Sequence, residues 1–195
     1  MSRKVLITGG AGFIGGNLVH YLNSHSPEWD IQVLDDLSTG LSSSLDGSQS
    51  NLVVGSILDS KLLTETAAGV DHIVHLAAIG SVPRSISSPR PTHEANITGT
   101  LNVLEAARQN SVKHVIVASS SSVYGSNPSL PRSEFDWTRP LSPYAVSKLA
   151  TEAYANAYAS SYGMKTAAFR FFNVFGPRQR ADHAYAAVIP KFVSA

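Results

Sequence analysis

The stretch Thr8-Gly9-Gly10-Ala11-Gly12-Phe13-Ile14-Gly15 decides the fold of this chain. A short aliphatic run, Lys4 to Thr8, precedes the glycines and predicts a strand, and the segment Phe13 to Ser24 that follows has helical periodicity. Glycines between a strand and a helix allow a tight turn and bring backbone N–H groups close to a bound diphosphate. A plain glycine-rich turn is the simpler alternative. A P-loop is disfavoured, because Gly16-Asn17 stands where a Lys followed by Ser or Thr would be required.

The same alternation of short β-branched runs and longer helical segments continues along the chain. Further strands are predicted at Ile31 to Leu34, Leu52 to Val54, His72 to Leu76, His114 to Ala118 and Thr166 to Arg170. Further helices are predicted at Ser60 to Ala67, Thr92 to Gln109 and Pro143 to Tyr162, and Ser38 to Ser50 is predicted to be a polar surface loop. This alternation is typical of an α/β fold, so we expect a doubly wound parallel sheet of the Rossmann type.

Composition sets bounds on the class of protein. The 195 residues are 43% hydrophobic, which is enough for one sizeable core, and the formal net charge of +1 gives no single-sign field to recruit nucleic acid or an anionic membrane. No apolar run approaches the ~20 residues that span a bilayer, and cysteine is absent. The histidines do not form a convincing metal set, since His72 and His75 would point to opposite faces of their strand. We expect a cytoplasmic protein with no metal, nucleic-acid or membrane partner.

Asp35 stands at the end of the second predicted strand, about 20 residues after Gly15, where a carboxylate accepts hydrogen bonds from an adenosine ribose. Taken alone, an acidic residue that caps a solvent-facing turn would be the better interpretation. With the glycine stretch, the spacing fits a dinucleotide. No Arg or Lys occurs between Lys4 and Lys61 to neutralise a ribose 2′-phosphate, so NAD is preferred over NADP.

Tyr144-Ala145-Val146-Ser147-Lys148 places a phenol and an ammonium on one face of a predicted helix. A free tyrosine has a pKa near ~10, and positive charge from Lys148 and an oxidised nicotinamide would stabilise the phenolate and lower that pKa. The same spacing on an ordinary helix is usually an exposed face. Ser119-Ser120-Ser121-Ser122 follows a predicted strand and brings hydroxyls to the carboxyl end of the sheet, although a polar turn remains an alternative for Ser121 and Ser122.

These motifs together closely resemble the extended short-chain dehydrogenase/reductase family, over essentially the whole chain. The segments Ala77 to Ser85, Pro140 to Val146 and Ala184 to Lys191 look most like bacterial UDP-N-acetylglucosamine 4-epimerases of surface-polysaccharide pathways. The resemblance implies Tyr144 as base, Lys148 as its partner at the nicotinamide ribose, and Ser120 as a hydrogen-bond partner of the reacting hydroxyl. It implies NAD contacts from Gly9, Gly12, Phe13, Ile14, Gly15, Asp35, Asp36, Leu37, Ser38, Thr39, Gly40, Ser56, Ile57, Leu76, Ala77, Ala78, Ile79, Gly80, Asn96, Tyr144, Lys148 and Phe172. It implies substrate contacts from Gly80, Ser81, Ser120, Ser121, Tyr144, Asn173, Ala187 and Val188.

The activity implied by the resemblance is inversion at carbon 4 of a UDP-hexose through a 4-keto sugar, with UDP-GlcNAc/UDP-GalNAc as the first pair and UDP-Glc/UDP-Gal as the second. It also implies a homodimer formed by the helices Thr92 to Gln109 and Pro143 to Tyr162. Ser56 departs from the usual family Asp, which puts one adenine contact in doubt, and Gly80 stands where glucose-type epimerases often carry a Lys. Relatives continue well beyond Ala195, so we expect an NAD-binding domain at residues 1–170 and only the start of a smaller substrate region at 171–195.

Rival interpretations stay within the family or abandon catalysis. A 4,6-dehydratase would need an Asp-Glu pair where Ser121 and Ser122 stand, and a keto-sugar reductase would usually favour NADP. A decarboxylase on the same fold is a further alternative. From another class, the chain could be a non-catalytic module that binds NAD, and in a chain without the substrate region we expect NAD binding to outlast catalysis.

Overall fold

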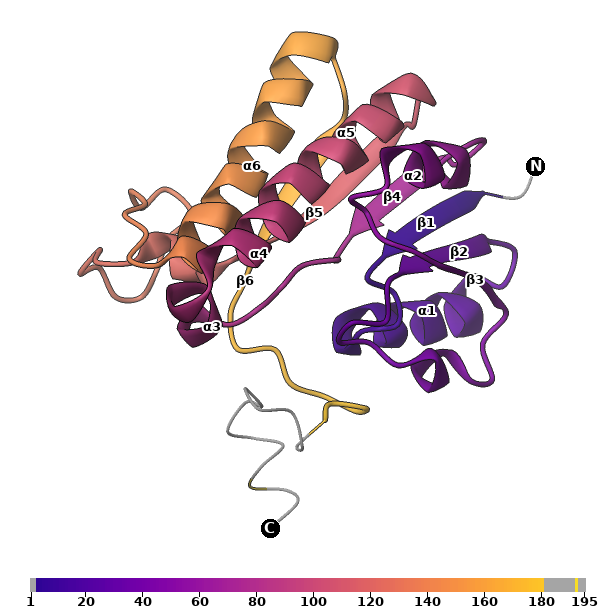
Figure 1. The fold of residues 1–195 in the computed structure, drawn as a ribbon, viewed down its shortest axis with the longest axis horizontal. Helices are drawn as coiled ribbons and strands as arrows, with labels where there is room; N and C mark the ends of the chain where they lie inside the picture. Colours follow the sequence, from indigo (N-terminus) through magenta and orange to yellow (C-terminus); the bar gives the residue numbers. More distant parts are fainter. Residues whose placement is uncertain (1–2, 181–191, 193–195) are drawn as a thin grey trace.

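The computed structural model describes residues 3–180 and 192 and contains a six-stranded sheet whose strands are all parallel (Figure 1). The strands are β1 Lys4–Thr8, β2 Asp30–Asp35, β3 Ser50–Val54, β4 His72–His75, β5 His114–Ser120 and β6 Thr166–Phe171. Their order is β3-β2-β1-β4-β5-β6, so the direction of winding reverses between β1 and β4. The predicted doubly wound parallel sheet is confirmed, and each predicted strand overlaps an observed one.

Two hydrophobic cores cover the two faces of this sheet. Alternate residues of a strand point to opposite faces, so Leu6 of β1 joins one core while Val5 and Ile7 join the other. The first core packs under the helices α2 Ser60–Thr66, α5 Gly99–Gln109 and α6 Pro143–Tyr162, and the second under α1 Phe13–His25. Burial on both faces explains why the centres of β1, β2, β4 and β5 carry aliphatic residues that point to both faces of the sheet.

Two helical segments differ from the sequence prediction. The predicted helix Thr92 to Gln109 begins earlier, as α4 Pro89–His93, and reaches α5 through a π-helical turn, Glu94–Thr98. A helix α3, Val82–Ser87, was not predicted, because its proline and serines give no apolar periodicity. Proline is tolerated in the first turn of a helix, where its missing N–H has no partner to lose, and Ser81 caps the helix by accepting a hydrogen bond from the Arg84 N–H.

The segment predicted as the polar loop Ser38 to Ser50 is partly ordered structure. It contains a short 3-10 turn, Ser42–Leu45, and Leu45 is buried in the core beside α1. One apolar side chain therefore anchors an otherwise polar connection. The predicted domain boundary at residue 170 stays a prediction, and β6 runs one residue past it.

Candidate functional site

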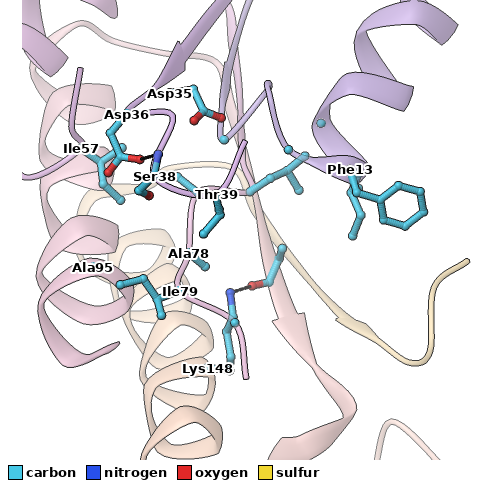
Figure 2. Close-up of a pocket in the computed structure, with 18 of the residues that line it drawn as sticks. Phe13, Asp35, Asp36, Ser38, Thr39, Ile57, Ala78, Ile79, Ala95 and Lys148 are labelled. Carbon is cyan, nitrogen blue, oxygen red and sulfur yellow. Dashed lines mark hydrogen bonds between the residues drawn. The ribbon is translucent and has the colours of Figure 1, made fainter. Parts of the chain in front are cut away.

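A cavity of about 620 Å³ lies at the carboxyl ends of the strands, where ligands bind in open α/β sheets. Twenty of the predicted cofactor and substrate residues line it: Gly9, Gly12, Phe13, Ile14, Gly15, Asp35, Asp36, Ser38, Thr39, Ser56, Ile57, Leu76, Ala77, Ala78, Ile79, Gly80, Ser120, Tyr144, Lys148 and Phe172. Figure 2 shows Asp35 and Asp36 toward one end of this cavity and Lys148 toward the other. The cavity is therefore acidic at one end and basic at the other.

The glycine turn between β1 and α1 requires residues without a side chain. Gly9 has a φ of +74°, and a Cβ there would lie 2.5 Å from the backbone nitrogen of Ala77. A Cβ on Gly15 would lie 2.4 Å from the carbonyl oxygen of Gly9. Gly12 begins the helix without a side-chain cap, and no acidic residue occupies the first turn. The helix start thus offers backbone N–H groups and a positive dipole end to an anion.

Asp35, at the end of β2, is tied to the same turn. Its two carboxylate oxygens accept hydrogen bonds from the N–H groups of Ala11 and Leu37, both at 2.9 Å. Burial raises the pKa of Asp35, and these two hydrogen bonds lower it in part. Each carboxylate oxygen has a second lone pair, so Asp35 can still accept hydrogen bonds from ribose hydroxyls.

The loop Leu76 to Gly80 forms one wall of the cavity and is fastened by Asn96. The Asn96 side chain accepts a hydrogen bond from the Ile79 N–H at 2.8 Å and donates to the Ile79 carbonyl at 3.1 Å and to the Ser147 hydroxyl at 2.9 Å. Asn96 is 1% exposed and does not line the cavity. Asn96, predicted as a cofactor residue, thus links the loop Leu76 to Gly80 to Ser147 of α6 through hydrogen bonds.

Tyr144 and Lys148 face the cavity from the first two turns of α6. Ser142 caps this helix by accepting a hydrogen bond from the Ala145 N–H at 3.1 Å, and the Tyr144 N–H donates to the Ser85 hydroxyl at 3.0 Å. The Lys148 ammonium donates to the carbonyl oxygen of Ala118 on β5 at 2.9 Å, as Figure 2 shows. Burial lowers the pKa of Lys148 to about 8.

The phenol of Tyr144 is desolvated and hydrogen-bonded. Burial raises its pKa, and a hydrogen bond with Ser120 lowers it in part. The expected lowering by Lys148 together with an oxidised nicotinamide stays a prediction, because it requires the bound cofactor. Ser120 also accepts a hydrogen bond from the Ser122 hydroxyl at 2.9 Å, which orients the Ser120 oxygen.

Several predicted residues lie outside the cavity lining. These are Leu37, Gly40, Ser81, Asn96, Ser121 and Asn173, while Ala187 and Val188 lie outside the described residues. The Ser81 hydroxyl is engaged as the cap of α3, and a Cβ on Gly40 would lie 2.9 Å from the Ala11 backbone. Gly40 therefore serves close packing of the turn. The roles predicted for the other residues stay predictions.

Ten lining residues were not predicted: Leu34, Gly55, Leu58, Pro91, Glu94, Ala95, Ala118, Ser119, Phe171 and Val174. The rule that ligands gather at the carboxyl ends of strands would have found those at or just after the ends of β2, β3, β5 and β6. Pro91 lies in α4, before the predicted helix start at Thr92. Glu94 and Ala95 lie within the predicted helix Thr92 to Gln109, but its position beside the cavity could not be read from the sequence.

The comparison with known families rests on nearly the whole chain. The profile of the NAD dependent epimerase/dehydratase family matches residues 5–195. The chain belongs to this family. Its helices give no sign of a membrane span, since none within residues 3–180 or at 192 is both long enough and apolar enough to cross one.

Relatives in the epimerase/dehydratase family include both epimerases and dehydratases. A UDP-glucose 4-epimerase of Mycolicibacterium smegmatis is 38% identical over an aligned length of 200 residues, and the alignment covers 98% of this chain and 62% of that protein. The structure of a UDP-N-acetylglucosamine 4-epimerase from Methanobrevibacter ruminantium M1 in complex with UDP-N-acetylmuramic acid superposes with a TM-score of 0.93 at 38% identity, covering 100% of this chain and 62% of that one. The structure of a double mutant of a dTDP-glucose 4,6-dehydratase from Streptomyces venezuelae, with NAD and a second ligand bound, superposes with a TM-score of 0.89 at 36% identity, covering 97% of this chain and 61% of that one. The chain thus spans about three fifths of the length of these relatives.

Proposed function

We propose that this chain holds NAD in the cavity at the carboxyl ends of the strands and supplies the acid-base residues for inversion at carbon 4 of a UDP-hexose. The observation that carries the proposal is the convergence of Tyr144, Lys148 and Ser120 on one end of a cavity whose other end is the glycine turn with Asp35. A general base and a dinucleotide cradle in one cavity suit hydride transfer at a carbon that bears a hydroxyl.

The residues present fit NAD. The side-chain-free turn of Gly9 and Gly15 and the uncapped start of α1 suit a diphosphate, and the Asp35 carboxylate suits ribose hydroxyls. Asp36 adds a second carboxylate at the same end of the cavity, and no Lys or Arg lines the cavity there among the described residues. A ribose 2′-phosphate would meet negative charge only, which supports NAD over NADP.

In the proposed reaction, Tyr144 removes the proton from the sugar 4-hydroxyl while Ser120 hydrogen-bonds the same oxygen. NAD held by the glycine turn and Asp35 would supply a hydride acceptor that becomes the hydride donor, and the positive charge of its oxidised ring. After the 4-keto sugar rotates to present its other face, Tyr144 would return the proton to the oxygen at carbon 4 as the hydride comes back to that carbon. Lys148, fixed to the Ala118 carbonyl, holds an ammonium one helical turn from Tyr144. Because burial raises the pKa of Tyr144, the phenol stays protonated when no cofactor is bound. It needs the added positive charge of the oxidised nicotinamide ring to act as a base.

UDP-GlcNAc and UDP-GalNAc are the proposed sugar pair, with UDP-Glc and UDP-Gal as the second. Gly80 supports the first pair, since a Cβ built there meets no atom within 4 Å and the wall beside it is open. A dehydratase activity is disfavoured, because Ser122 is committed to Ser120 and neither Ser121 nor Ser122 can act as a carboxylic acid. The homodimer is also a proposal, to be tested by analytical ultracentrifugation.

The test uses NMR to monitor conversion of UDP-GlcNAc to UDP-GalNAc by the full-length protein in the presence of NAD. Tyr144→Phe should bind NAD as the parent does and convert substrate about 10²- to 10⁴-fold more slowly, because the fold and cradle are kept and only the base is lost. NAD binding with no conversion of any UDP-hexose would favour the non-catalytic module. A Tyr144→Phe variant as active as the parent would exclude Tyr144 as the base.

A further inference from the structure

Lys148 and Glu152 lie one turn apart on α6, at a spacing where opposite charges usually pair. In the structure they do not pair with each other. The Lys148 ammonium donates to the Ala118 carbonyl, and the Glu152 carboxylate binds Arg170 of β6. Another group therefore binds the Glu152 carboxylate in place of the nearby Lys148 ammonium.

That group is the Arg170 guanidinium, which forms a bidentate ion pair with Glu152. Arg170 donates from Nε and Nη2 to the two carboxylate oxygens of Glu152, both at 2.9 Å, and the Ser119 hydroxyl donates to the same carboxylate. Glu152 is 7% exposed and the Arg170 side chain is 21% exposed, so the carboxylate is largely shielded from water. The two parallel hydrogen bonds fix the plane of the carboxylate, which a single ammonium cannot do.

Arg170 is itself held in place from two sides. Its guanidinium lies 4.8 Å from the centre of the Tyr124 ring, and its Cα is the register partner of Ser119 across β5 and β6. Tyr124 is buried, and the hydrogen bonds with Glu152 are the main cause of a raised pKa for Arg170. Arg170 is thus a permanent, preplaced cation next to the carboxylate.

We propose that Arg170 is a positioning residue. Together with Ser119 it binds the Glu152 carboxylate and so prevents Glu152 from pairing with Lys148. The Lys148 ammonium therefore stays hydrogen-bonded to the Ala118 carbonyl, where it faces the cavity. The role of Lys148 at a cofactor rests on the proposed function. The competition between Arg170 and Lys148 for Glu152 does not depend on it.

The surroundings of Lys148 make a freed Glu152 its strongest alternative partner. The other titratable groups that face it or share its cavity are Tyr144 on α6, His75 on β4, Asp35 at the end of β2, Asp36 directly after it, and Glu94 on the π-helical turn. Burial and the charge of Lys148 lower the pKa of His75 to about 3, so His75 is neutral, and Asp35 and Asp36 lie toward the far end of the cavity. Because Lys148 is desolvated, a carboxylate one turn away would stabilise its charged form strongly.

The test titrates Lys148 without cofactor. Lysine side-chain carbons are labelled, the pH dependence of their NMR shifts is followed, and Lys148→Met assigns the signal. Arg170→Met should raise the Lys148 pKa from about 8 by at least one unit, a tenfold change, as Glu152 turns to the ammonium. The double variant Arg170→Met with Glu152→Gln should return it to within about half a unit of the parent.

The matched control is Arg108→Met, which breaks the Arg108–Glu105 pair on α5 and should leave the Lys148 pKa unchanged. A merely structural Arg170 would give no shift in Arg170→Met, or the same shift in the double variant, and either result overturns the proposal. If Arg170→Met does not fold, Arg170→Lys, with and without Glu152→Gln, replaces it and should show a smaller rise that the second substitution cancels.

NAD affinity is the second measurement. Arg170→Met should weaken NAD binding about tenfold, or about 1.4 kcal/mol, and the double variant should recover most of it. A parent that binds no NAD would count against the proposed function alone, since the Lys148 titration needs no cofactor.

Discussion

Replacing Gly15 with alanine probes the glycine turn at its tightest point. The new Cβ would lie 2.4 Å from the Gly9 carbonyl oxygen and 2.6 Å from the Gly10 Cα, and ordinary contact begins at 3.4 Å. The turn and the start of α1 must therefore separate by about 1.0 Å (3.4 − 2.4 = 1.0). Backbone on both sides leaves no flexible side chain to move instead.

The expected cost follows from that displacement. Overpacking of this kind costs about 1–3 kcal/mol, and the better helix propensity of alanine returns up to about 1 kcal/mol, so we expect a net loss of about 1–2 kcal/mol in the free energy of unfolding. The N–H groups at the start of α1 would move by a similar 1.0 Å relative to a bound diphosphate. We expect NAD affinity to fall at least tenfold, about 1.4 kcal/mol.

Chemical denaturation and calorimetric titration with NAD measure the two effects separately. Gly69→Ala is the matched control, because Gly69 has a φ of +69° with no atom near its Cβ position, so alanine there is strained without touching the turn. It should lose about 1–2 kcal/mol of stability and keep the parent's NAD affinity. Unchanged NAD binding in Gly15→Ala, or equal weakening in both variants, would refute the reasoning.

Three further predictions concern single side chains. NADP should bind at least tenfold more weakly than NAD because of the carboxylate at Asp35, and Asp35→Ser should narrow that gap in calorimetry. The Thr92 hydroxyl is buried with no hydrogen-bond partner in the described part of the chain, so Thr92→Val should raise the free energy of unfolding by about 1 kcal/mol. The Lys148 pKa is lowered from 10.5 to about 8, so between these pH values the unfolded chain binds more protons and the parent gains stability as pH rises. Lys148→Met should therefore be more stable than the parent near pH 7, by about 3 kcal/mol at most, and lose this advantage by pH 10.5 in denaturation curves.

The framework of the fold was readable because its strands are buried on both faces. Runs such as Lys4 to Thr8 have an apolar centre, Val5 to Ile7, and the helices between the strands bury apolar residues at helical spacing. Four of the six strands are one or two residues longer than predicted, since pairing with a neighbour extends a strand beyond its apolar centre, whereas β4 ends one residue earlier than predicted. Helix α3 escaped prediction because it has no apolar periodicity, and the π-helical geometry of Glu94–Thr98 inside the predicted helix Thr92 to Gln109 could not be read from the sequence.

Part of the site could be predicted from the rule that ligands bind at the carboxyl ends of parallel strands. That rule placed the serine run that contains Ser120, whereas Tyr144 and Lys148 were predicted from their four-residue spacing on a helix, and all three residues line one cavity. The raised pKa of Tyr144 could not be foreseen, because desolvation depends on how deeply the phenol is buried. The partnership of Glu152 with Arg170 was also invisible, since these residues are 18 positions apart on different elements.

A crystal structure of the chain grown with NAD tests the central claim most directly. We predict the diphosphate on the turn from Gly9 to Gly15, the adenosine ribose on Asp35, and the nicotinamide beside the Tyr144 hydroxyl. A dinucleotide bound elsewhere, or a nicotinamide out of reach of Tyr144, would contradict the account.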